Sequence, residues 1–393
     1  PEIHPAIWVL FFTLLGFGLR TYQLGFQPLW GDEGWSFYFA MQPVGQLLAL
    51  TAVDIHPPLY YLLLKGWLLL CGTGAEKARL LSVVSGTLLI PVAAVLGRRI
   101  FSWRSGLLSA AVTAVMPLAI YYSQEVRMYG LVTLLGALSV YFFLRLERQP
   151  ARRRLLAAYL GTTAAALYSH YYAIFIVLAQ LLYVVLAGLQ ARLRPGALIN
   201  SLRPLVYVGL LYLPWIIYVG AQLATYVENK RNIEGYSPLG PVQFLGDHLV
   251  AFSLGHVPVY TWAALLPVGI GLLGFVPAIF RKGPQIKLLY LYFLTPLLCG
   301  YVINLLYPFT PRYFERTLLL AAPGYWLFIA AGLDRLWQRH YHFMNVAWLA
   351  LLLPVLGSLF NFYALPRYPD QDYRPLLTEV SARATPADTL LAS

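Results

Sequence analysis

Hydrophobic runs of roughly 20 residues, the length of a transmembrane helix, recur along the chain from its first residues to about position 363. Short polar segments separate the runs, and no soluble block interrupts the series. The runs lie at approximately residues 6–24, 78–97, 105–122, 129–146, 155–169, 171–190, 203–222, 257–280, 286–306, 316–333 and 343–363. This pattern predicts an all-α polytopic membrane protein of about eleven transmembrane helices, forming one transmembrane domain over residues 1–363.

One further apolar run, residues 57–71 (PPLYYLLLKGWLLLC), does not fit the series. It is short for a crossing, begins with two prolines and contains Lys65. If it crossed, every later loop would change sides and the arginine-rich loops would face outside. We therefore predict an in-plane or re-entrant helix in the first outer loop; the alternative is a chain with one more crossing.

The last segment, residues 364–393, has a different composition. Pro366, Asp370 and Asp372 precede a polar stretch with a helix-like pattern. This segment is predicted to be the start of an outer soluble element.

The overall composition agrees with lipid as the main solvent. Hydrophobic residues make up 59% of the chain and charged residues 11%, whereas soluble domains carry about 25% charged residues. The two cysteines, Cys71 and Cys299, lie far apart inside apolar runs, so they indicate neither a disulfide framework nor a metal cluster.

Lys and Arg residues are concentrated in alternate loops, which predicts the orientation of the chain. The basic clusters are Arg98, Arg99 and Arg104; Arg145, Arg148 and Arg152 to Arg154; Arg192, Arg194 and Arg203; Arg281, Lys282 and Lys287; and Arg335 and Arg339. Loops rich in Lys and Arg stay in the cytoplasm, so the N-terminus is predicted inside and the tail outside. The net charge of +12 thus follows topology and indicates no nucleic-acid partner.

With this orientation, two acidic residues face the outer side in the first outer loop. Asp32 and Glu33 follow Gly31 in an aromatic setting at the membrane boundary. A carboxylate against an apolar wall has a raised proton affinity that suits a general base, and a neighbouring acid can assist it. The alternative is a solvated pair of loop residues within an interfacial aromatic belt.

The end of the same loop contains Asp54 and His56. Two prolines follow His56 and would hold it rigidly as a hydrogen-bond donor or a cation. An ordinary interfacial histidine before a helix whose first turn tolerates proline explains the pattern equally well.

The next two outer loops contribute further polar residues. Glu125, Arg127 and Tyr129 lie between two spans, where ionisable residues usually mark a function or pair with each other. A pair between Glu125 and Arg127 is disfavoured, because residues two apart on a helix point to different faces. His170, in the third outer loop, is by itself more typical of interfacial packing.

The fifth outer loop places Arg312 and Tyr313 at the mouth of a span. The forked donors of a guanidinium suit a phosphate, and headgroup snorkelling is an equally good explanation. No Walker loop, dinucleotide fingerprint, zinc motif or nucleophile elbow occurs in the sequence, which argues against a soluble nucleotide-sugar site and an ATP-driven pump.

Taken in order, these motifs resemble those of a known family. Asp32-Glu33, the D-x-H-P-P at 54–58, YYSQEVRMYG at 121–130 and PRY at 311–313 are similar to motifs of the GT-C glycosyltransferases of the protein O-mannosyltransferase-like group, which includes the lipid A aminoarabinose transferases. The resemblance extends over about residues 20–375 and implies a GT-C fold. It also implies an enzyme that transfers a sugar from a polyprenyl-phosphate carrier to an acceptor hydroxyl on the non-cytoplasmic face. The acceptor (a protein, a glycolipid or a cell-wall polymer) stays open.

The resemblance also implies roles for single residues. Asp32 takes the position of the family's base, Glu33 completes the acidic pair, and His56 stands where the aminoarabinose transferases have a phosphate-contacting lysine. No catalytic metal is expected, and a single displacement with one base would invert the anomeric centre. The candidate substrate-binding residues are Asp54, His56, Glu125, Arg127, Tyr129, His170, Arg312 and Tyr313.

The competing hypothesis is a multi-span transporter or lipid flippase without transferase activity. Such a protein would be expected to have charged residues in the middle of its spans and broken helices in two matched halves. The sequence has no such symmetry, and its ionisable residues gather at one face. We therefore predict a multi-pass enzyme of the plasma membrane whose site lies on the extracytoplasmic side.

Overall fold

The structure is a computed structural model that describes residues 4–190, 195–234, 236–281, 283–308, 311, 313–367 and 371–383. The described residues form helices and connecting segments, with no strand among them. The helices are α1 (Pro5–Thr21), α2 (Gly31–Met41), α3 (Val44–Ala52), α4 (Leu59–Cys71), α5 (Ala75–Ile100), α6 (Trp103–Val115), α7 (Pro117–Tyr121), α8 (Tyr129–Arg148), α9 (Arg153–Ser169), η1 (Tyr171–Ala173), α10 (Ile174–Gln190), α11 (Pro195–Glu234), α12 (Pro241–Leu254), η2 (Thr261–Ala264), α13 (Leu265–Ile279), α14 (Pro284–Leu306), η3 (Phe314–Ala321), α15 (Ala322–Arg339), η4 (Tyr341–Phe343), α16 (Met344–Ala364) and α17 (Arg374–Arg383).

Each predicted hydrophobic run coincides with one or more of these helices. In the described part of the chain, 8 helical segments are long and apolar enough to cross a membrane, and α1 and α4 are shorter apolar helices. The prediction of an all-helical membrane protein is confirmed. The number of about eleven spans is not established by these lengths.

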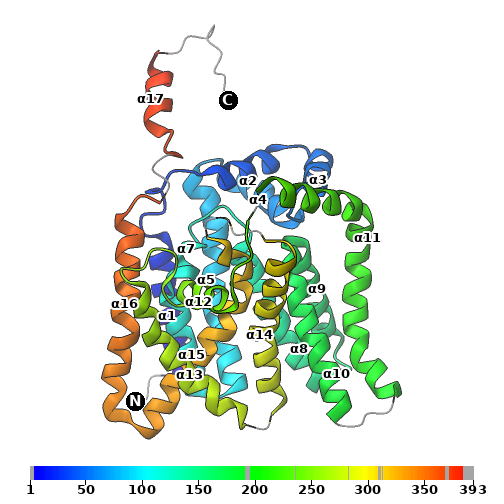
Figure 1. The fold of residues 1–393 in the computed structure, drawn as a ribbon, viewed down its shortest axis with the longest axis vertical. Helices are drawn as coiled ribbons and strands as arrows, with labels where there is room; N and C mark the ends of the chain where they lie inside the picture. The colour runs from blue at the N-terminus through cyan, green and yellow to red at the C-terminus, as the bar shows by residue number, and fades with distance from the viewer. Residues whose placement is uncertain are drawn as a thin grey trace.

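The two ends of the helical bundle differ in the loops that they carry. Figure 1 shows α2, α3 and α4 together at the upper end, whereas α10, α13 and α15 end, and α11, α14 and α16 begin, at the lower end. The described basic residues in or next to these helix ends are Arg203, Arg281, Lys287, Arg335 and Arg339. The acidic pair Asp32 and Glu33 at the start of α2 and these basic residues therefore lie at opposite ends of the molecule.

Helix α4 forms from the apolar run that did not fit the series of spans. Its 13 residues extend over about 20 Å, less than the roughly 30 Å of a hydrocarbon core. Lys65 Nζ donates to the carbonyl oxygens of Ala40 (3.3 Å) and Gln42 (2.9 Å), which attaches α4 to the end of α2. Whether α4 lies in the plane of the membrane, re-enters it or crosses it stays a prediction.

A buried arginine stabilises the break between α6 and α7. Pro117 at the start of α7 has no N–H to donate, so the last carbonyl groups of α6 need other partners. Arg20 is buried and donates to the carbonyl oxygens of Thr113 (3.1 Å) and Ala114 (3.0 Å), and its Nε donates to Ser123 Oγ (3.2 Å). The arginine thus fixes both the break and the start of the second outer loop.

Helices α13 and α15 pack at very short range through glycines. A Cβ atom on Gly274 would overlap the carbonyl oxygen of Phe328, and one on Gly332 would overlap that of Ile270. Small residues allow this close approach of backbones in membrane proteins. The contact holds α15, and η3 before it, in a fixed position.

Helix α12 lies in the interval between the predicted runs at 203–222 and 257–280, where the sequence predicted no helix. Its residues Phe244, His248, Ala251 and Phe252 are buried and share one face of the helix. The run is too short and too polar to be recognised as a span.

The last two helices of the described chain are α16 and α17. Helix α16 ends at Ala364, next to the predicted boundary at 363, and Figure 1 shows α17 beyond the upper end of the bundle. Whether residues 364–393 begin a soluble segment stays a prediction.

Candidate active site

Asp32 lies in the first turn of α2, where the partial positive charge of a helix N-terminus favours an acidic residue. Its carboxylate oxygen Oδ2 is 3.2 Å from Nη2 of Arg316 and 3.8 Å from Nη2 of Arg127. The Asp32 side chain is 29% exposed, whereas those of the two arginines are 5% and 13% exposed. An accessible carboxylate therefore lies between two mostly buried guanidinium groups from distant parts of the chain.

Glu33, the neighbouring residue, has a different environment. It is fully buried, and its two oxygens accept hydrogen bonds from Arg79 Nε (2.9 Å) and Nη2 (2.8 Å). The backbone N–H of Val126 also donates to Glu33 Oε1 (2.9 Å). The catalytic assignment of Glu33 stays untested, but its oxygens are engaged and the geometry favours a structural role.

Arg79 extends this structural role to the whole first outer loop. Its guanidinium also donates to the carbonyl oxygens of Leu24 (2.8 Å), Gln27 (2.9 Å) and Pro28 (3.0 Å). A buried, bidentate Arg–carboxylate pair with all these bonds is rigid. It therefore fixes the start of α2, and with it Asp32.

Arg127 connects the first and second outer loops. Its Nη1 donates to the backbone oxygen of Asp32 (3.2 Å), and its guanidinium lies 5.8 Å from the ring centre of Tyr129. The guanidinium of Arg316 lies over the rings of Trp30 (5.2 Å) and Tyr129 (5.6 Å). The predicted residues Arg127 and Tyr129 thus belong to the same cluster as Asp32.

His56 lies between a carboxylate and a guanidinium. Its Nε2 is 3.4 Å from Nη2 of Arg127, a group that can only donate, and its Nδ1 is 3.3 Å from Oδ2 of Asp54. Burial and the nearby Arg127 charge lower the pKa of His56, against the opposing effect of Asp54. The geometry therefore favours a neutral imidazole that donates to Asp54, and not the cation that its position suggested.

His170 packs against this group, 5.5 Å from the His56 ring and 5.8 Å from the Tyr129 ring. Its Nδ1 accepts from the backbone N–H of Tyr172 (3.1 Å). Burial, and then the proximity of His56, hold the pKa of His170 well below its ordinary value. The structure thus brings His170 to the cluster as a second neutral imidazole.

Glu125 has a partner in the segment 364–393, which was predicted to begin an outer soluble element. Its Oε1 is 3.7 Å from Nη1 of Arg367, and both side chains are buried. The Arg367 guanidinium also lies over the rings of Tyr121 (4.5 Å) and Phe362 (4.7 Å). Burial raises the pKa of Glu125 to about 7, although the Arg367 charge opposes the shift.

The predicted fifth loop contributes Arg316, a residue that the sequence analysis did not single out. Arg312 lies outside the described residues, and Arg316 provides the contact to Asp32. Tyr313 adopts a left-handed backbone conformation (φ 64°) and stacks on the His256 ring at 4.3 Å. The position of Arg316 at the beginning of an apolar run was the feature of the sequence that could have indicated a functional residue. Nothing in the hydropathy pattern indicated Arg79 or Arg367 as partners.

The described part of the chain contains no group of three or more His, Cys, Asp or Glu residues placed to hold a metal ion. The positive charge beside Asp32 comes from guanidinium groups. Such an arrangement can bind an anion at the arginines and accept a proton at the carboxylate.

A comparison with protein families gives one match. Residues 55–218, less than half of the chain, match the family described as dolichyl-phosphate-mannose-protein mannosyltransferase. No curated protein matches the chain significantly in sequence.

Solved structures resemble the chain over most of its length. The apo oligosaccharyltransferase of Archaeoglobus fulgidus has a TM-score of 0.66 at 13% identity, with 98% of this chain and 59% of that chain covered. The oligosaccharyltransferase AglB from Archaeoglobus fulgidus, in complex with an inhibitory peptide and a dolichol-phosphate, has a TM-score of 0.65 at 13% identity, covering 98% of this chain and 58% of that one. ArnT of Cupriavidus metallidurans bound to undecaprenyl phosphate has a TM-score of 0.61 at 18% identity, covering 86% of this chain and 62% of that one.

This chain therefore spans less than two thirds of the length of each of these proteins. At such low identities the likeness establishes the fold. The fold that the motifs implied is thereby confirmed.

Proposed function

We propose that this chain, which has the fold of the GT-C glycosyltransferases, is a glycosyltransferase with a polyprenyl-phosphate-linked sugar as donor. It moves the sugar to an acceptor hydroxyl, with inversion at the anomeric carbon. The observation that carries the proposal is the position of Asp32 between Arg127 and Arg316 at one end of this fold.

The residues of the cluster match the needs of this reaction. Asp32 accepts the proton of the acceptor hydroxyl as its oxygen attacks the anomeric carbon. The bond to the carrier phosphate breaks at the same time, and the phosphate leaves with its bonding electron pair. Arg127 and Arg316 stabilise the charge that develops on it.

The pairing of the arginines with Asp32 suggests how the donor enters. Without a donor, Asp32 partly neutralises both guanidinium groups. A bound phosphate competes for the same guanidinium donors with more acceptor oxygens, and its arrival releases Asp32 to act as a base. Binding of the donor thus frees Asp32 to act as the base in the transfer reaction.

The remaining cluster residues shape the site. Asp54 and the neutral His56 position Arg127, and His170 packs behind them. Tyr129 supports both guanidinium groups. The proposal includes no catalytic metal, because Arg127 and Arg316 supply the positive charge that the leaving phosphate requires.

Two further parts of the proposal concern partners and location. Dolichol-phosphate and undecaprenyl phosphate, bound in the structures of AglB and ArnT, are the model for the carrier of this chain. The acceptor is a hydroxyl of a protein, a glycolipid or a cell-wall polymer. The membrane is the plasma membrane, with the cluster on its extracytoplasmic side, because the basic residues near the ends of α13 and α15 lie at the opposite end.

Purified protein incubated with a panel of polyprenyl-phosphate sugars tests the function. We expect release of polyprenyl phosphate, by transfer or by slow hydrolysis, with at least one sugar. A transporter or flippase would instead move the intact lipid between the leaflets of a vesicle without breaking the glycosidic bond. Lipid movement with no bond cleavage would overturn the proposal in favour of transport.

A further inference from the structure

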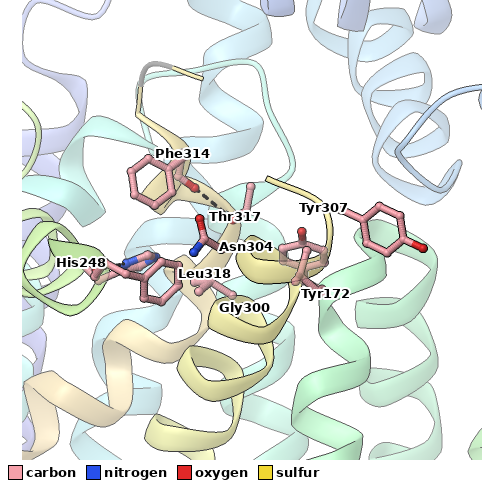
Figure 2. A pocket seen from close by; sticks show the side chains of 10 residues that line it. Tyr172, His248, Gly300, Asn304, Tyr307, Phe314, Thr317 and Leu318 are labelled. Carbon is pink, nitrogen blue, oxygen red and sulfur yellow. Dashed lines mark hydrogen bonds between the residues drawn. The ribbon is translucent and has the colours of Figure 1, made fainter. Parts of the chain in front are cut away.

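A pocket lies between α12, α14, η1 and η3, among residues that the candidate active site does not use (Figure 2). Phe244 of α12, Ile303 of α14, and Phe314 and Leu318 of η3 give it a mostly apolar wall, which Tyr172 completes. Helix η3 separates the pocket from Asp32, since Arg316 contacts Asp32 while the next residue, Thr317, lines the pocket.

His248 provides an unusual polar group in this wall. It is fully buried on α12, and Figure 2 shows its imidazole directed into the pocket beside Asn304. Its Nε2 has no hydrogen-bond partner among the described residues. A buried nitrogen without a partner costs about 1–3 kcal/mol, so the chain retains His248 here at a cost in stability.

The hydrogen bond at the other ring nitrogen determines what Nε2 can do. His248 Nδ1 lies 2.7 Å from the carbonyl oxygen of Phe244, which can only accept, so Nδ1 carries the proton. Burial lowers the pKa of His248 to about 4, despite the opposing effect of this hydrogen bond. The imidazole is therefore neutral near pH 7, and its buried Nε2 carries a lone pair that no described residue uses.

Four other residues with polar side chains line the pocket, namely Asn304, Thr317, Tyr172 and Tyr307. Asn304 exchanges two hydrogen bonds with the backbone of Leu239, both at 3.0 Å. Thr317 Oγ1 donates to the carbonyl oxygen of Phe314 (3.0 Å). The pocket thus combines a largely apolar wall with the His248 Nε2 acceptor, which has no partner among the described residues.

We propose that this pocket binds the hydroxyl end of a neutral, apolar alcohol, such as a lipid alcohol, with the ligand O–H donating to His248 Nε2. A carboxylate or phosphate would meet the lone pair of Nε2 with its own lone pairs and is disfavoured. An ammonium group would lose its hydration in an apolar pocket, which is costly. The ligand is thus distinct from the anionic carrier proposed for the active site.

Photolabelling of the purified full chain tests this site without relying on transferase activity. The probe is octanol that carries a diazirine, in a detergent without hydroxyl groups, and labelled peptides are mapped by mass spectrometry. We expect saturable labelling of α12, α14 or η3 that excess 1-octanol prevents. A diazirine-bearing octane should label these segments about tenfold less at equal concentration, as expected for the loss of one hydrogen bond.

Two variants decide whether His248 is responsible. His248→Phe keeps the ring shape and removes the unpartnered nitrogen, so we expect an unchanged or higher melting temperature and roughly tenfold weaker octanol labelling. His340→Phe, at an exposed histidine far along the chain, is the matched control and should label like the parent protein. If His248→Phe does not fold, Ile303→Phe, which narrows the pocket and keeps His248, should abolish the labelling.

Two outcomes would overturn the proposal. One is equal labelling by the octanol and octane probes, which would indicate partitioning into any apolar surface. The other is undiminished octanol labelling in folded His248→Phe, or in Ile303→Phe where that variant replaces it. The proposed transferase function is unaffected by either outcome.

Discussion

Adjacent residues Asp32 and Glu33 illustrate how strongly environment separates two identical functional groups. Both carboxylates lie in the first turn of α2, yet successive helical residues point about 100° apart. Glu33 turns into the protein and binds Arg79, whereas Asp32 turns toward Arg127 and Arg316 and stays partly accessible. We therefore propose proton transfer as the role of Asp32 and anchoring of the loop as the role of Glu33.

Removing the proposed base is the first prediction. Asp32→Asn keeps the size of the side chain and part of its hydrogen bonding but cannot accept a proton, so the rate of sugar transfer should fall by about two orders of magnitude or more. Binding of the polyprenyl-phosphate sugar should persist, since both arginines remain. Transfer and donor binding are measured on the same preparation; a fully active Asn variant would move the base to another residue, with Glu125 the next candidate.

The second prediction concerns the phosphate. Arg127→Gln and Arg316→Gln each remove a mostly buried guanidinium, so each should weaken donor binding by about tenfold or more. Arg374→Gln is the control, because Arg374 is half exposed and its carboxylate partner is Asp372. Arg367 is unsuitable for this purpose, because it is buried beside Glu125. Equal donor affinity in all three variants would exclude the proposed phosphate contact.

The third prediction follows from the raised pKa of Glu125. The ordinary value is 4.5 and the folded value about 7, so between these values the folded chain holds a proton that the unfolded chain has released. This contribution to stability is complete below pH 4.5 and is lost as the pH rises through 7. The melting temperature of the parent protein should therefore fall more between pH 5 and pH 8 than that of Glu125→Gln.

The parent protein must be compared with Glu125→Gln because other groups also titrate in this pH range. The lowered pKa values of His56 and His170 make stability increase as the pH rises toward the ordinary histidine pKa, which is the opposite direction. This effect is present in both proteins. Their contribution cancels in the difference. Identical melting profiles would show that Glu125 stays ionised, held by Arg367.

At the scale of elements, the hydrophobic pattern predicted the helices well because lipid imposes one requirement on every span. Backbone groups must be paired within the segment, so an apolar run of sufficient length is a helix. The pattern was less informative where protein, not lipid, surrounds the chain. Helix α12, the α6–α7 break and the Arg20 hydrogen bonds depend on neighbours distant in sequence.

The glycine contact between α13 and α15 gives the fourth prediction. Gly332→Ala places a methyl group against the backbone of Ile270 in α13, which can be relieved only by separating the helices, so it should destabilise the protein by about 1–3 kcal/mol. Gly269→Ala in α13 is the control, because its Cβ would meet no atom within 4 Å. A helical alanine there should be neutral or stabilising. Thermal unfolding in detergent compares the two, and an equal effect would disprove the tight contact.

At the scale of the whole molecule, the sequence predicted the two-ended distribution of charge but not the contacts that assemble the site. Asp32, Glu125, Arg127 and His170 were expected on one side, and the structure brings them into one cluster. The partners Arg79, Arg316 and Arg367 were missed, because a basic residue at a helix end is equally typical of snorkelling. Only packing in three dimensions distinguishes the two environments.

Orientation in the membrane is the fifth prediction. In a chain with Cys71 and Cys299 replaced by alanine, Val53→Cys lies between α3 and α4 and Arg153→Cys begins α9, and both positions are exposed. An impermeant thiol reagent should label Val53→Cys in intact cells and Arg153→Cys only after permeabilisation. Ser123 would be uninformative, because it is buried against Arg20. The reverse pattern would place the candidate site in the cytoplasm.

The pairing of Asp32 with Arg127 and Arg316 also determines when the site is complete during synthesis of the chain. The ribosome synthesises Asp32 early and Arg127 about a quarter of the chain later. Arg316 follows only after most of the spans have been synthesised. At roughly 5–20 residues per second, the 284 positions between Asp32 and Arg316 take about 15 to 60 seconds to synthesise. During that interval the nascent chain lacks Arg316, so its site is incomplete. A chain whose synthesis stops before η3 can therefore insert into the membrane but is expected to be inactive.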